Sequence, residues 1–150
     1  MTGQVGLVHH RSEEGAWSVM LPENLVMDVA CLEDGVVAAG RGGVTRLEDD
    51  GTIRWHTVLP SLPDAVAVAE DGTIGVGGLG RIWGLSADGE VRWTLAVDEE
   101  MYLTGAAFDA DGRLVVAGWH AGALFGQVYW LSPDGRLPVS YTHLTLPTTY

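Results

Sequence analysis

The residues of this chain that are able to do chemistry are few, and their spacing matches no known catalytic or metal motif. The chain has five histidines, at His9, His10, His56, His120 and His143. Zinc-binding histidines on one element follow short patterns such as H-E-x-x-H, which is absent. A G-x-S-x-G nucleophile motif and a Walker loop are absent as well. The sequence therefore predicts no catalytic residue, no metal ligand and no cofactor, although residues gathered from distant parts of the chain would escape such a search.

Two further motifs have a chemical and a structural interpretation. Residues 75–80 fit the pattern G-x-G-x-x-G, but a dinucleotide site needs a helix directly afterwards, and an apolar strand pattern begins at Arg81 instead. Residues 109–112, Asp-Ala-Asp-Gly, resemble the start of a calcium loop. An EF-hand needs more oxygen ligands and a glutamate at its twelfth position, whereas Arg113 and apolar residues follow here. We predict a structural glycine stretch and a hairpin turn, with a calcium turn as the alternative for the second.

The charge of the chain excludes some classes of partner. Eight Lys and Arg face twenty Asp and Glu, which gives a formal net charge of −12. Such a field repels nucleic acids and anionic membrane surfaces, because both are bound by neutralising phosphate charge. No apolar run approaches the roughly 18 residues that span a bilayer. We expect a solubilising acidic surface, no nucleic-acid partner and no membrane insertion; the identity of a protein or small-molecule partner is left open.

The N-terminal residues and the cysteine content bear on the compartment. Residues 1–6 have neither a basic segment nor an apolar segment of a signal peptide, so the compartment is cytoplasmic by default unless the protein begins before Met1. Cys31 is the only cysteine, which rules out an intrachain disulfide. Because it lies in the apolar run Val-Ala-Cys-Leu at 29–32, we predict a small buried hydrophobic residue.

The elements that position these residues follow a repeat. Trp17, Trp55 and Trp93 are spaced 38 residues apart. An Asp-Gly pair precedes each of the last two tryptophans and recurs in a third unit; the pairs are Asp50-Gly51, Asp88-Gly89 and Asp134-Gly135. A second series comes earlier in each unit, at Asp34-Gly35, Asp71-Gly72 and Asp111-Gly112. A period near ~40 residues with strand-like contents is typical of propeller blades.

Each unit contains four short apolar or β-branched segments separated by turn residues. In the first full unit they are 26–31, 36–40, 44–47 and 52–59. Asp-Gly between such segments is a strong hairpin signal, since aspartate tolerates the left-handed backbone and glycine has no Cβ to clash. No segment has sustained helical periodicity. The sequence predicts an all-β fold of antiparallel four-stranded units.

These units resemble bacterial β-propeller repeats, in particular the quinoprotein-like and "β-propeller repeat" groups. The resemblance rests on residues 108–118 (Phe-Asp-Ala-Asp-Gly-Arg-Leu-Val-Val-Ala-Gly) and on residues 82–93 and 129–135, and it extends over residues 4–137. It implies that the first strand of each blade lines a central channel and that the strand ending in tryptophan is outermost. Trp17, Trp55 and Trp93 are then expected to pack between blades.

The resemblance divides the chain into about three and a half blades. Part of a blade covers 4–21, and full blades cover approximately 25–59, 64–97 and 103–137. Since propellers have about 4–8 blades, this number leaves the ring incomplete. We expect a fragment of a larger propeller, or alternatively a protomer whose ring is closed by further protomers. Residues 138–150 lack the repeat and resemble translated sequencing-adaptor read-through, so we expect them to be non-native and without function.

The third unit is longer than the others by about eight residues, around 120–127. Insertions in repeats map to loops, and loops carry binding, so Trp119, His120, Phe125 and Gln127 form a possible binding loop, with an enlarged structural loop as the alternative. The function predicted from these features is a non-catalytic binding or scaffolding platform. The alternative is part of a propeller enzyme, such as a quinone-cofactor dehydrogenase or a lyase.

Overall fold

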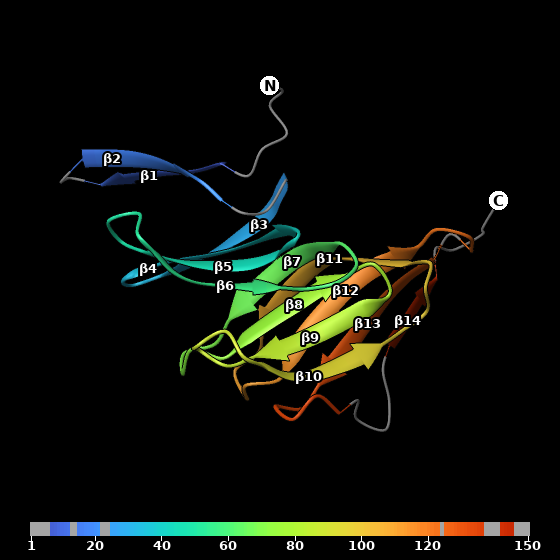
Figure 1. Cartoon of the computed structure of the whole chain (residues 1–150). Coiled ribbons are helices and arrows are strands. Elements are labelled where there is room, and N and C mark those ends of the chain that lie inside the picture. The colour runs from blue at the N-terminus through green and yellow to red at the C-terminus, as the bar shows by residue number, and fades with distance from the viewer. Residues whose placement is uncertain (1–6, 13–14, 22–24, 124, 137–141, 146–150) are drawn as a thin grey trace.

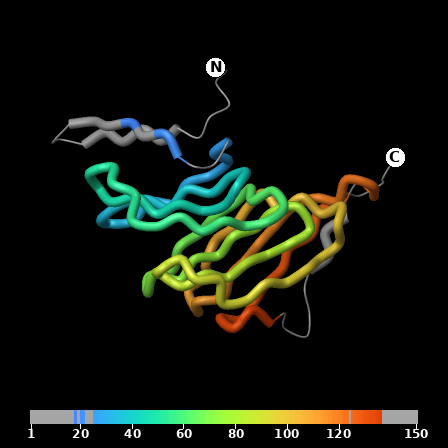
Figure 2. The backbone as a smooth tube through the Cα atoms, viewed as in Figure 1, coloured from blue at the N-terminus to red at the C-terminus, as the bar shows by residue number. Residues whose placement is uncertain are grey.

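The computed structural model describes residues 7–12, 15–21, 25–123, 125–136 and 142–145, and it has the predicted all-β fold. Three four-stranded antiparallel sheets follow one another along the chain after a two-stranded sheet (Figures 1 and 2). The two-stranded sheet consists of β1 (Leu7–Ser12) and β2 (Gly15–Met20). Among the described residues, no helix is long and apolar enough to cross a membrane.

We name the four-stranded sheets blades 1 to 3. Blade 1 is β3 (Leu25–Leu32), β4 (Gly35–Arg41), β5 (Gly43–Glu48) and β6 (Ile53–Val58). Blade 2 is β7 (Pro63–Val68), β8 (Ile74–Gly78), β9 (Arg81–Leu85) and β10 (Val91–Ala96). Blade 3 is β11 (Met101–Phe108), β12 (Leu114–His120), β13 (Phe125–Leu131) and β14 (Thr142–Thr145). Each blade is a meander in chain order, with β6 and β10 at the outer edge as predicted.

The first strands of the blades lie closest to one another. β7 packs against both β3 and β11, whereas the fourth strands diverge (Figure 1). A β-bulge recurs at the same place in all three strands, since the register shifts at Met27, Asp64 and Thr104. Bulges bend a strand and increase its twist, so the repeated bulge gives each blade the same curvature. Desolvation at this half-buried position raises the pKa of the Asp64 carboxyl above its usual value.

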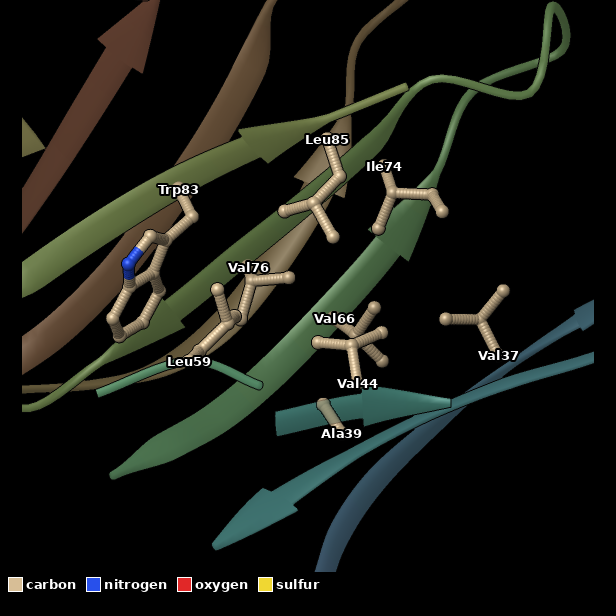
Figure 3. Packing of buried hydrophobic residues seen from close by; sticks show 9 residues of the cluster. All are labelled: Val37, Ala39, Val44, Leu59, Val66, Ile74, Val76, Trp83 and Leu85. Atoms are coloured by element: carbon tan, nitrogen blue, oxygen red, sulfur yellow. The ribbon is translucent and has the colours of Figure 1, made fainter. Parts of the chain in front are cut away.

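The core lies between the blades. One cluster joins blades 1 and 2 and is centred on Val44, Val66, Val76 and the fully buried Trp83 (Figure 3). A second cluster joins blades 2 and 3 and is built from residues such as Leu103, Leu114, Val116 and Leu131. Blade 2 therefore contributes apolar residues to both clusters, and its stability depends on its two neighbours.

The glycines at 75–80 have the structural role that was predicted. A Cβ atom on Gly75 would lie 2.4 Å from Leu114, and one on Gly77 would lie 2.9 Å from Val116. Strand β9 starts at Arg81, where a dinucleotide site would need a helix. The missing side chains of β8 thus allow blade 3 to pack closely on blade 2, and the structural interpretation of this motif is confirmed.

Antiparallel connections place every Asp-Gly turn at the same end of the blades. In an antiparallel meander the first and third strands run in the same direction and end at the same end of the blade. The turn after the first strand and the turn after the third strand therefore lie together. We call this end the turn end. The opposite end carries the connections from second to third strands and from each blade to the next.

Three details differ from the sequence predictions. The extra residues near 119–127 are mostly strand: they lengthen β12 to His120 and start β13 at Phe125, so the predicted loop is reduced to the turn between them. The cysteine Cys31 is exposed and not buried, because no further blade covers that face of β3 in the described chain. The outermost strand of blade 3, β14, comes from segment 138–150, which the repeat pattern had excluded.

Candidate binding surface

The aspartates of the turn end hold their own turns. The Oδ1 atom of Asp50 accepts a hydrogen bond from the backbone N–H of Thr52 at 3.0 Å. Asp71 accepts the equivalent bond from Thr73, also at 3.0 Å. These backbone hydrogen bonds hold the pKa of both carboxyls below their usual value. The Asp-Gly pairs at 50–51 and 71–72 are thus hairpin turns stabilised by the aspartate side chain.

The turn at 109–112 uses its carboxylates in the same way. The Oδ1 atom of Asp109 accepts hydrogen bonds from the backbone N–H groups of Asp111 and Arg113, each at 2.9 Å. The guanidinium of Arg113 lies 2.8 Å from Asp109 Oδ2 and 3.4 Å from Asp111 Oδ2. The pKa of Asp109 is lowered, first by the backbone hydrogen bond from Arg113. A calcium ion would have to displace this guanidinium, so the geometry is that of a hairpin turn.

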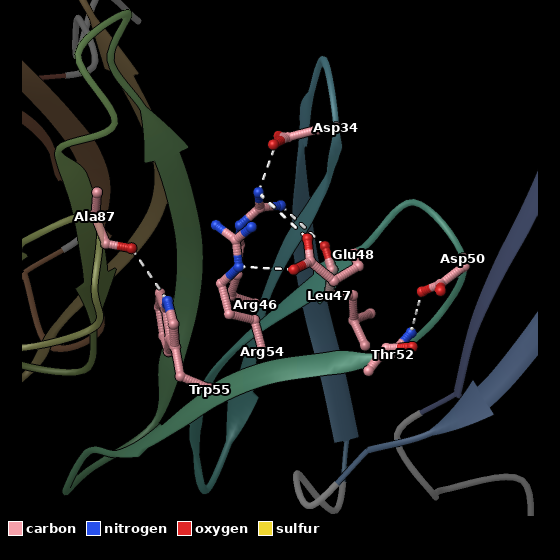
Figure 4. A network of polar contacts seen from close by, with 9 residues as sticks. All are labelled: Asp34, Arg46, Leu47, Glu48, Asp50, Thr52, Arg54, Trp55 and Ala87. Carbon is pink, nitrogen blue, oxygen red and sulfur yellow. Dashed lines mark hydrogen bonds and ion pairs between the residues drawn. The ribbon is translucent and has the colours of Figure 1, made fainter.

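The outer tryptophans lie on the turn of the following blade. Trp55 donates its indole N–H to the carbonyl of Ala87 at 3.1 Å, and a Cβ atom on Gly89 would lie 2.6 Å from its ring (Figure 4). Trp93 has the same relation to Gly135, where a Cβ atom would lie 2.3 Å from the ring. One unit's tryptophan therefore meets the next unit's Asp-Gly turn. The side chain of Trp17 lies outside the described residues.

Arg46 is the most buried charged residue of this end, with 5% of its surface exposed. It donates to Asp34 Oδ1 and to the carbonyl of Leu47, each at 2.9 Å (Figure 4). This guanidinium is the main reason that the pKa of Asp34 lies below its usual value. Arg54 is more exposed and pairs with Glu48 at 2.8 Å. No sequence motif marks this network, because its members lie on the β3–β4 turn, on β5 and on β6.

Two grooves open at the turn end, one at each junction between blades. The groove between blades 1 and 2 has a volume of about 640 Å³ and includes Arg46 and Arg54 in its lining. The groove between blades 2 and 3 has a volume of about 740 Å³ and includes Trp93 and Phe108. Glu70 and its neighbour Asp71 line both grooves. Carboxylates outnumber arginines in both linings, four to two in the groove between blades 1 and 2, so the grooves combine apolar side chains with excess negative charge. Such a surface suits a partner that carries both an apolar part and positive charge.

The opposite end contains a different cluster, centred on His120. Its Nδ1 atom accepts hydrogen bonds from the backbone N–H groups of Gly122 at 3.1 Å and Ala123 at 2.9 Å. Its Nε2 atom lies 3.1 Å from Asp98 Oδ2 and 3.8 Å from Glu100 Oε2. The imidazole is buried and stacks on Phe125 at a centroid distance of 5.0 Å. His120 therefore ties the β12–β13 turn to the segment that enters blade 3.

Asp98, Glu100 and His120 are close enough to hold a metal ion. The hydrogen bonds of His120 oppose this use. Because Nδ1 accepts two backbone N–H groups, the proton of the neutral ring is on Nε2, which donates it to Asp98 and has no lone pair for a metal. The arrangement holds the β12–β13 turn against the segment that contains Asp98. Sequence spacing could not reveal it, since Asp98 and His120 are distant along the chain.

Replacing His120 with alanine should lower the free energy of unfolding by about 2 kcal/mol, because the turn loses its acceptor and Phe125 loses its stacking partner. Glu99→Ala, an exposed change in the adjacent segment, is the control and should stay within about 0.5 kcal/mol. Denaturant unfolding measures both. Addition of zinc should leave the midpoint unchanged; a rise that depends on His120 would show that the site takes metal.

The four residues predicted as a binding loop do not form one surface. Trp119 is 48% exposed and stacks on Tyr102 with ring centroids 4.6 Å apart. His120 and Gln127 are buried, and Phe125 lies against His120. Trp119 and His120 are consecutive in a strand, so their side chains point to opposite faces of blade 3. Of the four, only Trp119 offers a large exposed surface.

Comparisons with known proteins show the fold. No protein-family model and no curated protein sequence matches the chain. Virginiamycin B lyase from Staphylococcus aureus is 15% identical with a TM-score of 0.73, over 95% of this chain and 50% of the lyase. BamB from Moraxella catarrhalis is 21% identical with a TM-score of 0.67, over 97% of this chain and 39% of BamB. The Pan2 WD40 domain of Neurospora crassa is 16% identical with a TM-score of 0.67, over 93% of this chain and 43% of that domain.

At these identities the likeness shows the fold alone. The three sheets are blades of a β-propeller, and the chain spans about half or less of the length of these solved structures.

Proposed function

We propose that this propeller module is a binding platform that holds its partner in the two grooves of the turn end. The observation that carries the proposal is the position of Glu70, which lines both grooves and joins them into one surface. The grooves lie on rigid sheet elements, since their walls are strand ends and turns fixed by the hydrogen bonds of Asp71 and Asp109. A rigid surface binds without the entropic cost of ordering itself.

The kind of partner follows from the chemistry of the lining. Trp93 and Phe108 offer aromatic surface in one groove, while Glu70, Asp71 and Asp111 supply negative charge. A net charge of −12 draws cationic partners to the whole module and repels anionic ones. We therefore propose a partner that presents basic side chains together with an apolar group, such as a basic segment of another protein.

The test uses fluorescently labelled hexalysine as a probe and compares two charge reversals. Glu70→Lys changes the shared wall of the grooves, and Glu99→Lys makes the same change of charge at the opposite end. Glu70→Lys should weaken hexalysine binding by about fivefold or more, and Glu99→Lys by less than about twofold. Binding should also weaken between about 50 mM and 500 mM salt.

Equal effects of the two reversals would contradict the proposal, because they would show that hexalysine responds to net charge alone. Hexaglutamate serves as the matched probe of opposite charge and should not bind. These measurements need only the chain itself and a check that both variants retain the far-ultraviolet circular dichroism of the parent.

A propeller enzyme is the second candidate, favoured by the presence of lyases among the solved structures with this fold. Its quinone-cofactor form has a simple test. Protein purified from its native source with bound quinone would absorb light at wavelengths longer than tryptophan does. Such absorbance, or turnover of a substrate, would move the function from binding to catalysis.

A further inference from the structure

A third, smaller groove lies on the outer half of blade 2, next to the groove between blades 2 and 3. It has a volume of about 460 Å³, within the range of about 300–1,000 Å³ that is usual for small-ligand pockets. The described residues that line it include Arg92 and no carboxylate, whereas carboxylates line both larger grooves. In a chain with a net charge of −12, this groove is therefore a local exception in its charge.

The side chain of Arg92 is directed by a β-bulge that recurs in the fourth strands. The register between third and fourth strands shifts at Arg54 in β6 and at Arg92 in β10, 38 residues later. A bulge bends the strand and re-aims the side chain at the extra residue. In blade 1 the guanidinium of Arg54 pairs with Glu48 at 2.8 Å (Figure 4). Ser86 occupies the position of Glu48 in blade 2, and within the described chain Arg92 has no ion pair.

The indole of Trp93 adds a second unpaired donor to this groove. In blade 1 the indole N–H of Trp55 donates to the carbonyl of Ala87. Trp93, at the equivalent position of blade 2, makes no such hydrogen bond to any described residue, although it lines the groove. A polar hydrogen in this position is available to an acceptor on a ligand.

The hydroxyl of Ser86 is a third donor. Its oxygen accepts hydrogen bonds from the backbone N–H groups of Asp88 at 3.3 Å and of Glu90 at 3.2 Å. The corresponding hydroxyl in blade 3, that of Ser132, donates to Asp134. Among the described residues the Ser86 hydroxyl has no such acceptor, so its hydrogen can be donated to a ligand.

We propose that this groove is a binding site for a carboxylate that is attached to an apolar group. The guanidinium of Arg92 has the charge and the parallel N–H donors that match a carboxylate, and the other two donors add to it. The rings of Trp93 and Pro133 supply apolar wall. The net charge of −12 repels phosphate dianions and polyanions more strongly than a single carboxylate. This site does not depend on the basic partner proposed for the two larger grooves.

The test uses N-acetylphenylalanine, which has a free carboxylate beside an aromatic ring, and its neutral amide of the same shape. A nuclear magnetic resonance titration should shift the indole N–H signal of Trp93, which Trp93→Phe assigns, and the amide should bind about tenfold more weakly than the acid. Arg92→Gln should weaken binding of the acid by about tenfold or more. The matched control is Arg54→Gln, which should change it by less than about twofold, because Arg54 is already paired with Glu48.

A second variant copies the arrangement of blade 1 into blade 2. Ser86→Glu places a carboxylate where Glu48 stands relative to Arg54, so it should pair with Arg92 and weaken binding by about tenfold or more. Ala121→Glu adds the same charge at an exposed position of the opposite end and should change binding by less than about twofold.

Equal binding of acid and amide, or unchanged binding of the acid by Arg92→Gln, would overturn the proposal. Inorganic phosphate that binds as tightly as N-acetylphenylalanine would overturn it as well, because the groove would then take any anion. Hexalysine binding is the separate measure of the two larger grooves, so failure of this site is distinguishable from failure of the proposed platform.

Discussion

Gly89→Ala will lower the free energy of unfolding by about 3 kcal/mol, whereas Gly112→Ala will cost about 1 kcal/mol. Both glycines have a left-handed backbone, with φ of +87° and +80°. A Cβ atom on Gly89 would lie 2.6 Å from the ring of Trp55, while one on Gly112 meets no atom within 4 Å. The difference between the two variants therefore reports the packing of a tryptophan on the turn of the next blade.

Denaturant unfolding followed by both tryptophan fluorescence and circular dichroism measures this difference. Coincident transitions are needed, because repeat structures can lose cooperativity between units. Gly135→Ala should behave like Gly89→Ala, since its Cβ atom would lie 2.3 Å from Trp93. If Gly89→Ala and Gly112→Ala cost the same, the contact between tryptophan and turn does not stabilise the stack of blades.

Arg46→Met will destabilise the protein by about 2 kcal/mol, because the buried carbonyl of Leu47 loses its charged donor. Methionine replaces the apolar stem of the arginine side chain and keeps most of its apolar contacts. The matched control is Arg54→Met, whose guanidinium is more exposed and pairs with Glu48. That change should stay within about 0.5 kcal/mol.

Thermal and denaturant unfolding at low and high salt separate the two arginines. The loss in Arg46→Met should persist at high salt, since a buried hydrogen-bonded charge is poorly screened, while any loss in Arg54→Met should shrink. A salt-sensitive loss of the same size in both variants would show that Arg46 acts through general surface charge.

The parts of the fold that depend on local chemistry could be predicted from the sequence. Asp-Gly pairs such as Asp50-Gly51 and Asp71-Gly72 fix turns because the aspartate bonds its own backbone and the glycine takes the left-handed conformation. The 38-residue spacing of the tryptophans then gives the length of the repeating unit. These two signals were enough for an all-β, four-stranded, propeller-like architecture.

The features that depend on contacts between distant units could not be predicted. Cys31 lies in an apolar run, yet its burial depends on a neighbouring blade and not on its own strand. The residues after Trp119 lengthen a hairpin, and hairpin length is not encoded by turn residues alone. The grooves joined by Glu70 arise only when strands from three blades meet.

The two ends of the blades have different roles in this account. At the turn end, aspartates such as Asp50 and Asp71 hold the turns by hydrogen bonds. A groove lies there at each of the two junctions between blades. At the opposite end, His120 holds segments together through Asp98 and two backbone N–H groups. We propose that the turn end binds the partner and that the opposite end stabilises the fold.

The most direct test is a nuclear magnetic resonance titration of the isotopically labelled protein with hexalysine. The account predicts that amide signals of Glu70, Asp71 and Asp111, at the grooves, shift progressively, while those of Gly122 and Ala123 beside His120 stay in place. Shifts confined to the opposite end, or shifts of equal size at both ends, would contradict the claim that this propeller binds its partner through the turn end.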